Sequence, residues 1–119
     1  MTTHVVTSHG ADFFGEDRHP VRTLVSLADY ARGSLPAAVR ARLVDLLEDA
    51  GRMEGGTGHT IPAAEVPGLA DQLRTVARAR GLRSPRLASA AALLADAAAR
   101  AAADGEPWTL TIETTEGAL

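Results

Sequence analysis

The sequence SPRLASAAALLADAAARAAADGEPWTLTIE, residues 84–113, decides more of the fold than any other stretch of the chain. Its Ser84-Pro85 pair is typical of a helix cap and first turn, and the alanine-rich run behind it reaches Gly105, a residue type that ends helices. Apolar and polar residues then alternate over 108–113, which indicates a strand with one face toward the core. The stretch therefore predicts a long helix with a small-residue surface, followed by a half-buried strand.

Helical spacing of apolar residues recurs three times before this stretch. The predicted helices run from Pro20 to Gly33, from Pro36 to Gly51, and from Val66 toward a cap at Gly81. Two short runs, Thr3–Ser8 and Thr57–Ile61, are predicted to be strands. The glycine- and charge-rich segment Gly10–His19 is predicted to be a loop.

These elements follow the order β-αα-β-αα-β. The predicted class is α+β: a small three-stranded sheet, mixed or antiparallel, with four helices covering one face. The chain has 119 residues, which suits a single domain over residues 1–119. Residues 1–54 and 55–104 would form two similar halves, each a strand followed by a helix pair.

Composition excludes several classes of function. The chain has no cysteine, and all twelve basic residues are arginine, so thiol chemistry, Schiff-base lysines and a P-loop lysine are excluded. No apolar run approaches the roughly 18 residues that span a membrane, and the N-terminus lacks the pattern of a signal peptide. We therefore expect a cytoplasmic protein. Abundant alanine and arginine without lysine or asparagine indicate a GC-rich genome of the actinobacterial kind.

Histidines and acids are concentrated near the N-terminus, where imidazole and carboxylate groups could exchange protons or bind a metal. The candidate polar site consists of His9, Asp12, Glu16, Arg18 and His19, with His59 across the sheet. A structural interpretation is also open. Glu16 and Asp17 precede a helix, where negative charge is favourable, and Phe13 and Phe14 could anchor the loop on the core.

The spacing in this cluster matches no known ligand set or catalytic triad. His4, His9 and His19 alone do not define a tetrahedral site. We therefore expect no catalytic residue, no metal and no cofactor.

A second candidate site is a basic tract with no acid between Asp71 and Asp96. Five arginines lie in it: Arg74, Arg78, Arg80, Arg83 and Arg86. In an acidic chain of net charge −3, this asymmetry indicates binding to an acidic protein partner. The turn at 77–87 also has a faint helix-turn-helix pattern, but its second helix is mostly alanine and leucine and offers little to DNA bases. Nucleic-acid binding is therefore the weaker alternative.

The segment His4–Asp17, the Ile61-Pro62-Ala63 sequence and the Trp108 strand together resemble small uncharacterised proteins of streptomycete-like actinobacteria. That family has no known function. The resemblance implies a small soluble α+β domain and transfers no site residue.

Two functions are open at this point. The first is a cytoplasmic accessory or regulatory protein that binds another macromolecule without catalysis. The second is a small enzyme or metal-binding protein built on the N-terminal histidines and acids.

Overall fold

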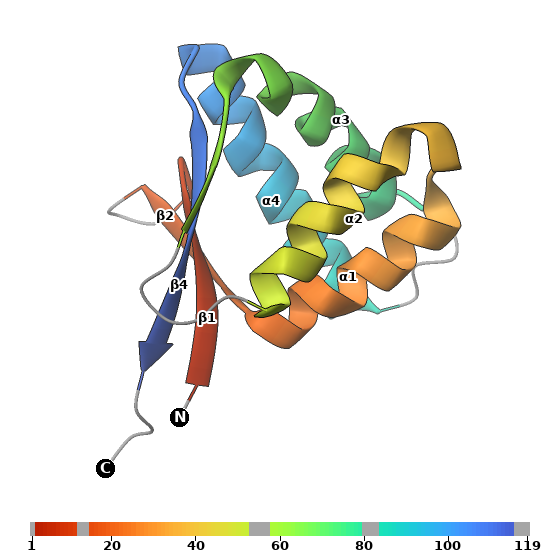
Figure 1. Ribbon diagram of the computed structural model, residues 1–119, viewed down its shortest axis with the longest axis horizontal. Helices are drawn as coiled ribbons and strands as arrows, with labels where there is room; N and C mark the ends of the chain where they lie inside the picture. Colours follow the sequence, from red (N-terminus) through yellow and green to blue (C-terminus); the bar gives the residue numbers. More distant parts are fainter. Residues whose placement is uncertain (1, 12–14, 53–57, 80–83, 116–119) are drawn as a thin grey trace.

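The computed structural model describes residues 2–11, 15–52, 58–79 and 84–115. The predictions made for Asp12, Phe13, Phe14 and Gly81 fall outside these residues, as do those for Arg80 and Arg83. The described elements form one sheet with a layer of helices on one of its faces (Figure 1). The predicted α+β class is thus confirmed.

The sheet has four antiparallel strands in the order β2-β1-β4-β3, one strand more than predicted. The strands are β1 (Thr2–Ser8), β2 (Glu16–Pro20), β3 (Gly58–Ile61) and β4 (Trp108–Thr115). In the two central strands, β1 and β4, Val5 lies opposite Ile112. Both of these side chains are buried, which places this face of the sheet toward the core.

The prediction of a loop over Gly10–His19 was wrong in its second half, where β2 pairs with β1 as an edge strand. Its sequence, EDRHP, has neither the β-branched residues nor the alternation that identify a strand. The pairing comes instead from a hairpin, in which Val5 lies opposite His19 and Ser8 opposite Glu16. Charged residues and proline are tolerated here because an edge strand has one side free.

Four α-helices are present in the described part of the chain, close to the predicted positions. They are α1 (Val21–Ser34), α2 (Ala37–Arg52), α3 (Val66–Ala77), preceded by the 3₁₀ turn η1 (Ala63–Glu65), and α4 (Pro85–Asp104). Helix α1 packs along α2, and α3 packs along α4. Gly33 lies within α1 instead of ending it, and α2 continues past Gly51.

Helix α4 has the ends that its sequence predicts. The Ser84 side chain accepts a hydrogen bond from the Leu87 N–H, and Gly105 follows the helix in the left-handed conformation, at φ 68°. The alanines along α4 let α3 approach it closely, and Ala97, Ala98 and Ala101 are fully buried. One hydrophobic cluster joins buried residues of all four helices with residues of β1, β3 and β4.

Candidate functional site

Among the described residues of the predicted polar site, Arg18 lies 4.0 Å from Glu16, but the histidines are apart. His19 lies on the edge strand β2 and His59 on the opposite edge strand β3, so two strands separate them. Arg18 is exposed, and its guanidinium nitrogen lies 3.5 Å from Glu113 Oε2. The Nε2 of His59 lies 3.7 Å from Asp49 Oδ2. Each of these pairs is a solvent-exposed surface contact, and such contacts contribute little to the free energy of unfolding.

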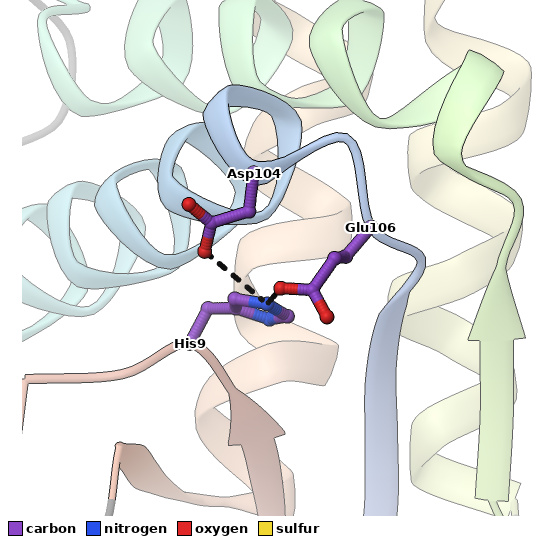
Figure 2. Close-up of side chains that lie close together, drawn as sticks. All are labelled: His9, Asp104 and Glu106. Carbon is purple, nitrogen blue, oxygen red and sulfur yellow. Dashed lines mark hydrogen bonds and ion pairs between the residues drawn. The ribbon is translucent and has the colours of Figure 1, made fainter.

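His9 instead meets two carboxylates that sequence analysis did not connect with it (Figure 2). Its Nε2 lies 3.3 Å from Glu106 Oε1 and 3.9 Å from Asp104 Oδ2. His9 and Glu106 are 97 residues apart in sequence, so no local spacing could reveal the cluster. Gly105 indicates where α4 ends, but no sequence signal indicates which strand end lies beside that turn.

Ser8 contacts the other ring nitrogen of His9, with Oγ 2.9 Å from Nδ1. A serine, a histidine and a carboxylate in this order resemble a catalytic relay. However, the Ser8 hydroxyl also accepts the Thr109 N–H at 3.0 Å, and the Ser8 carbonyl accepts the Trp108 indole N–H at 3.1 Å. Ser8 therefore joins β1 to the start of β4 through its hydroxyl and its carbonyl, which is a structural role.

The predicted arginine surface is described only in part. Arg74 lies 3.9 Å from Asp71 on the same helix, and Arg78 is exposed just beyond the end of α3. Arg86 is also exposed, in the first turn of α4. Arg86 lines two cavities.

Two adjoining cavities, of about 250 and 330 Å³, form a groove between the start of α1 and the start of α4. They share Thr23 and Arg86. We call this feature the helix-start groove; its lining residues are His19, Pro20, Arg22, Thr23, Ser26, Ser84, Arg86, Leu87, Ser89, Ala90 and Leu93. None of these described lining residues is acidic.

The charged side chains that line the helix-start groove are both arginines, so its charge is positive. The first turn of a helix carries unpaired N–H groups and a partial positive charge, so acidic residues are favoured there. Neither α1 nor α4 has an acid in its first turn, and both have an arginine there, Arg22 and Arg86. Helix α1 also lacks a side-chain cap. The groove therefore combines two helix starts with two guanidinium groups.

His19 forms part of the same wall, and it is only 3% exposed. Its Nε2 has no hydrogen-bond partner within the described structure. Burial lowers the pKa of His19 below its ordinary value, and the nearby Asp17 carboxylate offsets part of that shift. The imidazole is therefore neutral at pH 7, and its Nε2 is available for a hydrogen bond beside the groove.

The lowered pKa of His19 predicts that stability falls in acid. The unfolded chain binds the proton more tightly than the folded one, so the contribution of His19 is complete above about pH 6.5 and is lost as the pH falls through the folded pKa. Urea unfolding at a series of pH values measures this. A His19→Gln variant should lose that part of the pH slope, whereas His4→Gln should keep it. Identical slopes in wild type and His19→Gln would contradict the prediction.

A comparison with protein families identifies the chain. A family model described as a domain of unknown function, DUF7739, matches residues 10–111. The chain belongs to this family. The match confirms the expected relation to an uncharacterised family and assigns no activity. No curated protein and no solved structure matches the chain.

The DUF7739 match includes every residue that lines the helix-start groove, together with Asp104 and Glu106, and it begins one residue after His9.

Among the helices that the structure describes, none is both long and apolar enough to cross a membrane.

Proposed function

We propose that the protein is a small non-catalytic accessory protein of the cytoplasm, and that it binds an acidic segment of a partner protein in the helix-start groove. The observation that carries this proposal is the presence of Arg22 and Arg86 in the first turns of two helices that line one groove. The positive charge of each arginine is repelled by the partial positive charge at the start of its own helix, which destabilises the fold slightly. A bound anion would relieve both repulsions at once.

The groove suits a carboxylate-bearing chain segment. Guanidinium groups bind carboxylates through two parallel hydrogen bonds, and the hydroxyls of Thr23, Ser26 and Ser84 can donate further ones. Leu93, which lines the second of the two cavities, is 38% exposed and offers an apolar contact. An acidic segment with a neighbouring apolar side chain would contact both the arginines and Leu93.

Fluorescence anisotropy with a short labelled peptide rich in glutamate and leucine tests the proposal, with a glutamine-for-glutamate peptide as its neutral counterpart. We expect the acidic peptide to bind and the neutral one not to bind. The double variant Arg22→Glu/Arg86→Glu should weaken binding more than tenfold, because each charged hydrogen bond contributes about 1.5–3 kcal/mol. Binding should also weaken as salt is added.

The matched control is Arg42→Glu/Arg74→Glu, which changes the net charge equally on residues that do not line the groove. It should change the affinity less than about threefold, as expected for distant exposed charges. Equal losses in both double variants, or no binding of the acidic peptide, would overturn the proposal. Displacement of the peptide by pyrophosphate at far lower concentration than by free glutamate would instead assign the groove to a phosphate group.

A further inference from the structure

A second site lies at the other end of α4, where β1 and α4 both end. A helix of 20 residues is about 30 Å long, so this site is separate from the helix-start groove. His9 follows β1, Asp104 is the last residue of α4, and Glu106 lies between α4 and β4. One side-chain atom from each of the three lies within 4.8 Å of the other two (Figure 2).

The separations fit a single metal ion. Zinc binds nitrogen and oxygen ligands at about 2.0–2.2 Å, which puts neighbouring ligands of a tetrahedral site about 3.3–3.6 Å apart. The Nε2 of His9 is 3.3 Å from Glu106 Oε1 and 3.9 Å from Asp104 Oδ2. The ligand oxygens of Asp104 and Glu106 lie within 4.8 Å of each other, and rotation of these two exposed side chains would bring all three atoms to ligand spacing.

The backbone holds the three residues in place. Past the end of α4, the Gly105 and Glu106 N–H groups donate to Ala102 and Ala101 carbonyls, which folds the chain back so that Asp104 and Glu106 both approach His9. His9 itself has φ 60°, in the left-handed region that residues other than glycine rarely adopt. Its carbonyl accepts a hydrogen bond from Arg100 at 3.1 Å, which holds this conformation.

Ser8 sets the orientation of the imidazole ring. Its Oγ can accept the Nδ1–H of His9 as well as the Thr109 N–H, because a hydroxyl oxygen has two acceptor positions. In that tautomer the Nε2 lone pair faces two carboxylates, so three acceptors converge with no hydrogen among them. Metal-binding histidines usually have such a second partner on the other ring nitrogen.

We propose that His9, Asp104 and Glu106 bind a zinc(II) ion. The histidine nitrogen favours zinc over magnesium and calcium, which prefer ligand sets made of oxygen alone. Asp104 and Glu106 are each 59% exposed, so water can complete the coordination as it does in open zinc sites. This inference departs from the sequence-based expectation of no metal, because Asp104 and Glu106 meet His9 through the fold alone.

Isothermal titration of the full, tag-free chain with zinc sulfate after chelator treatment tests the site. We expect one zinc per chain, with binding weakened at least tenfold by His9→Ala and by Glu106→Gln, and little binding of magnesium. The matched control is His59→Ala, because His59 also lies near a carboxylate, Asp49, at 3.7 Å, but belongs to no three-residue cluster among the described side chains. This variant should keep the wild-type affinity.

A structural readout separates the zinc site from a plain ion pair. Two-bond ¹H–¹⁵N spectra should show the Nδ1–H tautomer at His9, with an Nε2 signal that shifts when zinc is added. Zinc binding that is unchanged in His9→Ala, or equally weakened in His59→Ala, would overturn the proposal. An Nε2–H tautomer that persists in excess zinc would also overturn it and would leave a hydrogen bond from His9 to Glu106.

Discussion

Replacing Trp108 with alanine is expected to lower the free energy of unfolding by about 3–5 kcal/mol, the range for truncating a large buried aromatic side chain. Trp108 begins β4, a central strand, and pairs there with Ile61 of β3. It is 1% exposed and belongs to the main hydrophobic cluster. Its indole N–H also donates to the half-buried Ser8 carbonyl, so truncation would remove that hydrogen bond as well.

Chemical unfolding followed by circular dichroism measures this loss, since the chain has no other tryptophan to report by fluorescence. Trp108→Phe keeps most of the apolar contact but not the donor, so it should lose less than the alanine variant. Thr111→Ala, at an exposed position of the same strand, should stay within about 0.5 kcal/mol of wild type. A loss below about 1 kcal/mol in Trp108→Ala would show that the β4 start is not part of the stabilising core.

Elements with strong local signals were predictable from the sequence. Helix α4 has a serine cap, a proline in its first turn and a glycine at its end, and β4 has regular alternation. The edge strand β2 had no such signal, because its pairing arises from the hairpin with β1 and not from its own residues. The β-propensity of its own residues predicts a polar edge strand poorly, because pairing with the neighbouring strand determines whether it forms.

The candidate sites also contain some residues that the local sequence indicates and others that only the fold brings together. The arginine tract is contiguous in sequence, so Arg86 could be proposed as a binding residue without a structure. Arg22 could not, since only the packed fold brings the start of α1 next to the start of α4. The carboxylate partners of His9 were missed for the same reason. Both carboxylates lie far from His9 in sequence, and the end of β1 meets the end of α4 through tertiary packing.

Gly10→Ala is expected to lower the free energy of unfolding by about 3 kcal/mol or more, which is at the severe end for one substitution. A Cβ built on Gly10 would overlap the backbone of Glu16 and Asp17 and would lie 2.7 Å from Asp17 Cγ. Backbone atoms of the paired strand cannot move aside as a flexible side chain can. The hairpin would have to open, with loss of the 2.8 Å hydrogen bond from the Gly10 N–H to the Gly15 carbonyl.

Gly33→Ala provides the matched comparison, because a Cβ there meets nothing within 4 Å and the residue lies inside α1. Alanine is favoured over glycine in a helix by about 0.5–1 kcal/mol, so this variant should equal or exceed wild-type stability. The two substitutions add the same methyl group, but only Gly10→Ala should lower the urea midpoint. If Gly10→Ala unfolded within about 0.5 kcal/mol of wild type, the close packing of the β1 end against β2 would be wrong, and the position of His9 beside Asp104 and Glu106 would lose its structural support.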